Sequence, residues 1–268
     1  MSKDPLAGCV AKIQRAQTHF DALNAEIDSF GKSKPDPYRF VSKVNVKSSR
    51  YLMRIKIDRA PPLEWALIAG DFVQNLRAAL DHLIWPLARA NGYPQQSGHA
   101  FPIFDARPPV KRGHPQWETW NRMLAGVHPA AIRFIDLCQP YQGGDGPGRR
   151  NLLAALRRLS NEDKHRNLLP AFAAVGASGE LDLKIKWSRD IETPLEGGEL
   201  RVGRPLDDGD VVFEAPVVVT GSDPAVQLEG KIPLDIAFGR RPASLEGLEQ
   251  MGKAVSYVVR RSRSFLGE

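Results

Sequence analysis

Three polar side chains share one side of a segment that is otherwise rich in leucine and alanine. When Gly70–His82 is placed on an ideal helix, Asp71, Asn75 and His82 fall within about 60° of one another. Free imidazole titrates near neutral pH, which suits general acid–base chemistry. A guanidinium binds phosphate or stabilises a developing negative charge. His82 is therefore a candidate acid or base, and the nearby Arg77 is a candidate anion ligand.

The same residues also have a structural interpretation. Asn75 and His82 can make hydrogen bonds to a neighbouring helix and so fix how the two helices pack. Arg77 and Asp81 lie four positions apart, the spacing at which opposite charges on a helix pair with each other. On a solvent-exposed surface such a pair adds little stability. Both interpretations predict that another helix or a ligand approaches this side closely, since alanines separate the polar residues.

A second polar cluster follows about eighty residues later. It consists of Asn161, Glu162, Asp163, Lys164, His165 and Arg166. If the helix that carries Leu152, Leu156 and Leu159 continues, Asp163 and Arg166 lie on its inward side. Buried charges must be paired or must line a cavity. Three arrangements stay open: a salt bridge between Asp163 and Arg166, a pocket shared with the first cluster, or a solvated charge run at a helix end.

Spacing gives little support to a metal centre. His82, Asp163 and His165 could come together around an ion, but no known metal-binding spacing connects them. We therefore predict no metal site and no cofactor. The two cysteines, Cys9 and Cys138, are far apart in the sequence, which excludes a disulfide scaffold and a cysteine-built zinc site.

The periodicity of apolar residues predicts an α+β fold. Helical spacing opens the chain, an alternating two-stranded ribbon follows, and further helices, further strands and a last helix complete it. We expect a helical bundle packed with an antiparallel sheet built from the early ribbon and the C-terminal strands. All of it forms a single domain, residues 1–268. The expected helical ranges are about 6–30, 62–170 and 243–266, and the β-rich ranges are about 38–58 and 180–240.

Composition is ordinary for a soluble protein. The 268 residues are 42% hydrophobic and 25% charged, with a formal net charge of +6 that permits an anionic partner. No secretory signal is visible, and no apolar run approaches the roughly 18 residues of a membrane span. We therefore expect a cytoplasmic protein with no membrane association.

Four motifs carry a resemblance to a set of uncharacterised bacterial proteins. The motifs read GDxxxNLRxALDH from Gly70, FPIF from Phe101, QPY from Gln139 and NxDKHR from Asn161. The resemblance extends over most of the chain and implies no particular activity.

Arg77-x4-His82 also resembles the Arg…His signature of HEPN domains. This resemblance implies a HEPN-like helical bundle, often dimeric, and metal-independent cleavage of RNA that uses the 2′-hydroxyl. It implies a role in a toxin–antitoxin or phage-defence system. Arg77 and His82 would be the catalytic pair. The surrounding binding residues would be Asp71, Asn75, Asp81, Asn161, Asp163, Lys164, His165 and Arg166.

Helical geometry adds a condition to this hypothesis. Residues five positions apart point about 140° away from each other, so one helix cannot aim Arg77 and His82 at the same phosphate. A two-fold dimer can combine them from two subunits, and we therefore expect a homodimer that binds RNA or a nucleotide. Two alternatives remain. The chain is a non-catalytic nucleotide- or anion-binding module with a structural polar core, or it is an interaction protein with an antitoxin-type partner.

Overall fold

The computed structural model places the described residues in two compact units. The helical unit comprises Met1–Asn24, Ala66–Leu168 and Glu246–Glu268, and the strand-rich unit comprises Ala25–Trp65 and Leu169–Leu245. The described residues are 4–143, 149–166, 168–174, 183–192, 198–200, 205–221, 226–230, 234–239 and 243–266. The predicted division into helical and β-rich ranges is close to these two units, and the prediction of a single domain over residues 1–268 stays a prediction.

The structure confirms an α+β protein. Its α-helices are α1 (Ala7–Lys32), α2 (Glu64–Ala90), α3 (Pro115–Met123), α4 (Pro129–Leu137), α5 (Arg149–His165) and α6 (Leu245–Ser262). Helix α5 ends at His165, and strand β3 (Pro170–Ala174) begins shortly after the helical unit ends at Leu168. Across the described ranges, every helix falls short of the length or the apolar character that a bilayer crossing requires.

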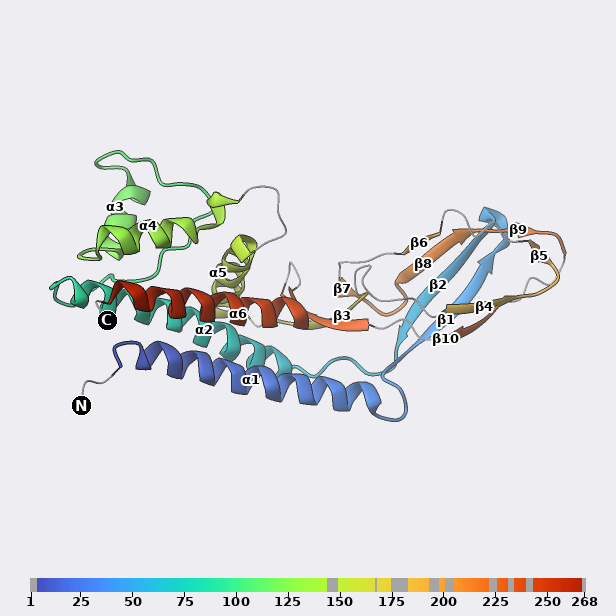
Figure 1. Cartoon of the computed structure of the whole chain (residues 1–268). Helices are drawn as coiled ribbons and strands as arrows, with labels where there is room; N and C mark the ends of the chain where they lie inside the picture. Colours follow the sequence, from blue (N-terminus) through green and yellow to red (C-terminus); the bar gives the residue numbers. More distant parts are fainter. Residues whose placement is uncertain are drawn as a thin grey trace. The chain divides into compact units, whose positions relative to one another are not determined.

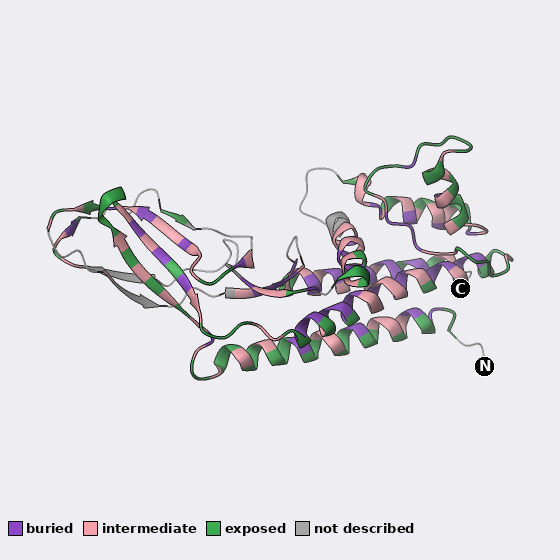
Figure 2. Cartoon of the chain, turned by 180° about the vertical axis from the view of Figure 1, so that it is seen from behind, coloured by how far each residue is buried: buried purple, intermediate pink, exposed green. Residues whose placement is uncertain are grey.

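The core of the helical unit forms around α2. Within this unit α1, α2 and α6 run side by side, and α5 crosses them (Figure 1). Leu76, Leu80 and Leu83 lie on the apolar face of α2 and are at most 1% exposed. The ring of Phe72 lies 5.7 Å from that of Phe20 on α1, and Gly252 of α6 approaches the same ring. Figure 2 shows the buried residues concentrated along α2 and α6.

The strand-rich unit is antiparallel in every pairing between its described strands. The ribbon predicted at 38–58 is the hairpin of β1 (Tyr38–Asn45) and β2 (Arg50–Ile57), closed by the 3-10 turn Val46–Ser48. Ser49 adopts the left-handed conformation there (φ 52°). Tyr51, Met53 and Ile55 are buried on one face of β2, as the alternating pattern predicts. The hairpin pairs through β2 with a later strand, β8 (Val211–Pro216), so the early ribbon shares a sheet with part of the later strands, as predicted.

The other described strands are β3 (Pro170–Ala174), β4 (Leu183–Trp187), β5 (Ile191–Glu192), β6 (Glu199–Leu200), β7 (Pro205–Leu206), β9 (Val218–Val219), β10 (Val226–Gly230), β11 (Leu234–Phe238) and β12 (Ala243–Ser244). The sheets have the orders β1-β2-β8-β6, β12-β11-β3-β7, β10-β4 and β5-β9. Two short 3-10 turns complete the helical unit, Pro140–Gln142 and Arg263–Phe265.

Candidate functional site

Asp163 of the second cluster contacts α2 at Gly70 and Gln74, neither of which belongs to the first cluster. The Gln74 side chain donates Nε2–H to Asp163 Oδ2 (2.9 Å) and to the carbonyl oxygen of Ser160 (2.9 Å), and Ser160 Oγ donates to Gln74 Oε1 (3.1 Å). A Cβ at Gly70 would overlap the carboxylate of Asp163, so glycine is what lets α5 approach α2 here. This confirms that the carboxylate faces inward. The contact is a closed hydrogen-bonded seam between two helices.

Arg77 and Asp81 form the predicted ion pair, and together they hold a loop. Arg77 Nη2 donates to Asp81 Oδ1 (2.7 Å) and Arg77 Nε to Asp81 Oδ2 (3.2 Å). The same Nη2 donates to the carbonyl oxygen of Phe101 (2.7 Å), while the Phe101 N–H donates to Asp81 Oδ1 (3.0 Å). The pair is therefore bonded to both polar groups of one backbone residue. The Arg77 side chain is only 16% exposed.

Gln139 holds the other end of the same loop, Phe101–Phe104. It is completely buried, donates Nε2–H to the carbonyl oxygens of Pro102 (2.8 Å) and Ile135 (3.1 Å), and accepts the Phe104 N–H (3.0 Å). We call this loop the strap. The motifs around Arg77, Phe101 and Gln139 thus belong to one packing arrangement that fastens the strap to α2 and to the end of α4.

His82, Asp71 and Asn75 lie elsewhere on α2. Asp71 and His82 are exposed, and Asn75 donates Nδ2–H to the carbonyl oxygen of Asp71 (2.8 Å). The imidazole of His82 lies beside Gly8 at the start of α1, where a Cβ would be 3.5 Å from His82 Nδ1. This side of α2 therefore faces the beginning of α1 and solvent. Asp163 contacts Gly70 and Gln74. Among the described residues, it makes no contact with Asp71, Asn75 or His82.

Beyond Asp163, the second cluster is mostly exposed, while Glu162 is half-buried. Asn161, Lys164, His165 and Arg166 are all exposed, which corrects the expectation that Arg166 lies on the inward side of α5. The Arg166 N–H still donates to the carbonyl oxygen of Glu162 (2.7 Å), but Arg166 follows the last residue of α5, and at this helix end its side chain lies in solvent. No three His, Cys, Asp or Glu side chains gather around a metal-sized space within the described ranges. The predicted residues thus form a seam, a loop anchor and two exposed groups.

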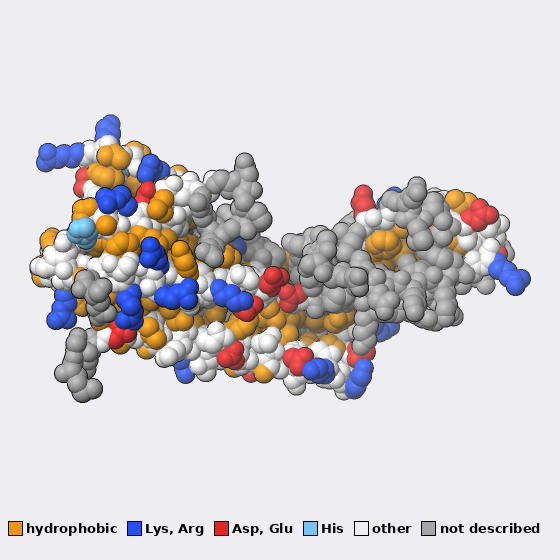
Figure 3. Space-filling model, in the orientation of Figure 1, with side chains coloured by type: hydrophobic (Ala, Val, Ile, Leu, Met, Phe, Trp, Pro, Cys, Tyr) orange, Lys and Arg blue, Asp and Glu red, His pale blue; other side chains and the backbone are white. Residues whose placement is uncertain are grey.

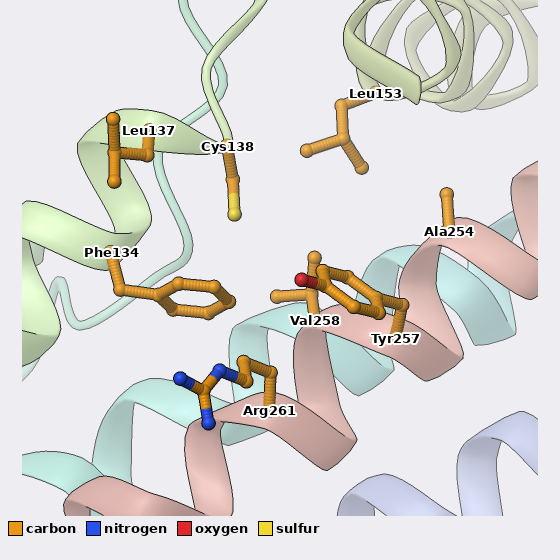
Figure 4. Close-up of a pocket in the computed structure, with 8 residues that line it drawn as sticks. All are labelled: Phe134, Leu137, Cys138, Leu153, Ala254, Tyr257, Val258 and Arg261. Atoms are coloured by element: carbon orange, nitrogen blue, oxygen red, sulfur yellow. The ribbon is translucent and has the colours of Figure 1, made fainter. Parts of the chain in front are cut away.

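The principal cavity among those described in this unit lies between α4, α5 and α6. It encloses about 410 Å³, within the range typical of small-molecule sites. It is lined by Phe134, Leu137, Cys138, Leu153, Ala254, Tyr257, Val258 and Arg261. Figure 4 shows the Cys138 sulfur and the rings of Phe134 and Tyr257 directed at a common space, with the Arg261 guanidinium on the Phe134 side. We call this the α4–α6 pocket.

The positive charge of the α4–α6 pocket is confined to its edge. Burial raises the pKa of the Cys138 thiol to about 12, so the thiol is protonated and neutral at physiological pH. Arg261 is exposed, and no carboxylate in the described part of the chain pairs with it. Figure 3 shows Lys and Arg side chains along the face over α6, beside hydrophobic ones. The pocket therefore combines an apolar interior with one available guanidinium.

The periodicity of α6 contained a signal for this pocket. Ala254, Val258 and Arg261 recur at helical spacing, so they lie on one face of α6. The sequence alone favours another explanation for Arg261, because a cation at a helix C-terminus is stabilised by the helix dipole. The cavity also requires residues of α4 and α5 that face α6. The spacing of residues within α6 alone does not predict this packing.

No protein-family model, curated protein or solved structure matches this chain. The resemblance to HEPN domains and to the bacterial set with the same four motifs therefore stays a prediction.

Proposed function

We propose that the helical unit is a non-catalytic binding module for a small anionic amphiphile, a molecule with an aliphatic body and one carboxylate. The observation that carries this proposal is an apolar pocket of about 410 Å³ with a single available guanidinium at its edge. The aliphatic body occupies the space between Phe134, Leu153 and Val258. The carboxylate binds Arg261. This is a specific form of the anion-binding alternative considered above.

The energetics favour a ligand of this kind. Burial of each methylene group contributes about 0.8 kcal/mol, so about six buried methylenes contribute roughly 5 kcal/mol. A hydrogen bond to a charged group adds about 1.5–3 kcal/mol. The loss of translational and rotational freedom and the ordering of the chain oppose these contributions, and the aliphatic body supplies most of the favourable free energy of binding. A simple ion without an aliphatic body would lose most of this binding energy.

The first prediction concerns the charge at the edge of the pocket. Isothermal titration with dodecanoate measures binding to the wild type and to Arg261→Gln, and the substitution raises the dissociation constant about tenfold because it removes the charged partner. Dodecan-1-ol, which lacks the charge, binds the wild type more weakly and is insensitive to Arg261→Gln.

Arg260→Gln is the matched control, because Arg260 is the exposed neighbour of Arg261 and does not line the pocket. Equal weakening by both substitutions contradicts the proposal, since it indicates a general effect of surface charge. Absence of dodecanoate binding to the wild type also contradicts it.

A second candidate function is the metal-independent ribonuclease activity of a HEPN-like homodimer, acting in the cytoplasm with an antitoxin-type partner. The observation that favours it is the exposed imidazole of His82, which lies beside Gly8 at the start of α1. The hydrogen bonds of Arg77 to Asp81 and Phe101 weigh against it, because they use two of the three guanidinium nitrogens. We therefore rank it second.

RNA cleavage provides the second prediction. If this candidate is correct, the wild type cleaves single-stranded RNA in the presence of EDTA, and His82→Ala abolishes cleavage at an unchanged melting temperature. His19→Ala, on α1, is the control and retains cleavage. Intact RNA after incubation with the wild-type protein eliminates this candidate and leaves the binding module untouched.

A further inference from the structure

A second cavity of the helical unit has a different character. It encloses about 350 Å³ between the 105–114 loop, α3 and α4. Three of the residues that line it are aromatic: Trp117, Trp120 and Tyr141. Trp120 is 6% exposed and is fixed by a ring contact with Phe104 of the strap, at 6.0 Å between centroids. Aromatic walls of this kind favour a flat ring that can stack on them or meet their edges. We call this the tryptophan pocket.

The charges of the tryptophan pocket leave one cation available. The Asp136 carboxylate accepts from Arg107 Nη2 (2.9 Å), from Gln142 Nε2 (2.6 Å) and from the Tyr141 hydroxyl (2.6 Å). Arg107 neutralises its charge. Arg133 also lines the cavity, is exposed, and forms no ion pair with another described residue. The cavity thus carries an excess positive charge, held by a guanidinium that suits a carboxylate.

The hydrogen-bonding groups of this cavity distinguish between two kinds of planar anion. A nucleobase needs donors and acceptors along its edges to be read, and the polar groups here already bond one another through Asp136. The remaining lining includes Pro108, Val110 and Ile132, which are apolar. An apolar ring system therefore fits this lining better than a base does.

We propose that the tryptophan pocket is a second binding site, which takes an aryl carboxylate. The ring lies against Trp117 and Tyr141, and the carboxylate binds Arg133. This inference goes beyond the proposed function, because it concerns another cavity and another class of ligand. The two sites share α4, whose Phe134 and Leu137 line the first pocket while Ile132 and Arg133 line the second.

The third prediction uses 2-naphthoate as the probe, with isothermal titration of the full chain. The wild type binds it, Arg133→Gln raises the dissociation constant about tenfold, and Trp117→Leu raises it at least as much. Arg112→Gln is the matched control, because Arg112 is an exposed arginine of the 105–114 loop and does not line the cavity. This substitution leaves naphthoate binding unchanged. Circular dichroism checks that each variant retains its helical content.

Several outcomes overturn the proposal. Lack of naphthoate binding to the wild type does so directly, and equal effects of Arg133→Gln and Arg112→Gln indicate surface charge instead of a site. Loss of binding in Arg261→Gln, with Arg133→Gln unaffected, places the ligand in the α4–α6 pocket. Tighter binding of AMP than of naphthoate, with the same dependence on Arg133, assigns the cavity to nucleotides. Retained naphthoate binding in a protein that does not bind dodecanoate supports this site while the proposed function fails.

Discussion

At the scale of single residues, the most informative side chain is Arg77. Its position in an Arg-x4-His pattern suggests chemistry, yet its guanidinium bonds the carboxylate of Asp81 and the carbonyl of Phe101. Asp81 in turn accepts the Phe101 N–H. A mostly buried group that satisfies a carboxylate and a carbonyl stabilises the fold, since either partner would otherwise be left unpaired. This role makes a stability measurement decisive for Arg77.

The fourth prediction is that Arg77→Ala lowers the free energy of unfolding by about 2 kcal/mol, because it leaves a carboxylate and a carbonyl without their donor. Urea denaturation measures this change. Arg89→Ala is the control, an exposed arginine in the last turn of the same helix, and it changes stability by less than about 0.5 kcal/mol. An Arg77→Ala protein as stable as the wild type would indicate that the guanidinium serves something other than the strap.

At the scale of elements, the sequence predicted the helices and the hairpin well and the site poorly. The helical ranges predicted at about 6–30 and 243–266 contain most of α1 and all of α6, and alternating residues such as Tyr51 and Met53 predict the buried face of the hairpin. Such periodicities are local, so a single sequence contains them. Asp163 was correctly placed inward by the same reasoning. The prediction that Arg166 also lies inward is wrong, because the last residue of a helix is harder to predict from sequence than the presence of the helix.

The cavities could not be predicted for a related reason. Each requires side chains from segments that are distant in the sequence, such as Cys138, Leu153 and Val258 in the α4–α6 pocket. Single residues are ambiguous in the sequence. The position of Arg261 near the C-terminus of a helix is already explained by the helix dipole, so it does not by itself indicate a binding site. The first and third motifs anchor the strap, through Arg77 and Gln139, and the second motif forms the strap itself. Gly70 of the first motif and Asp163 of the fourth lie in the seam between α2 and α5.

At the scale of the whole molecule, the chain builds its helical unit from three separated stretches and its strand-rich unit from two. The last helix, α6, returns to the helical unit after the final strands and supplies one wall of the α4–α6 pocket. That pocket therefore requires the middle and last stretches of this unit to be assembled. Ligand binding to it is accordingly a property of the folded unit.

The most direct test of the binding-module proposal is where dodecanoate lies when bound. Intermolecular nuclear Overhauser effects between the ligand's alkyl protons and labelled methyl groups measure this. The fifth prediction is that cross-peaks connect the alkyl chain to the methyls of Val258 and Leu153, which line the α4–α6 pocket, and not to those of Ile132 in the tryptophan pocket. Cross-peaks to methyl groups of the strand-rich unit, or none at a saturating dodecanoate concentration, would contradict the proposal.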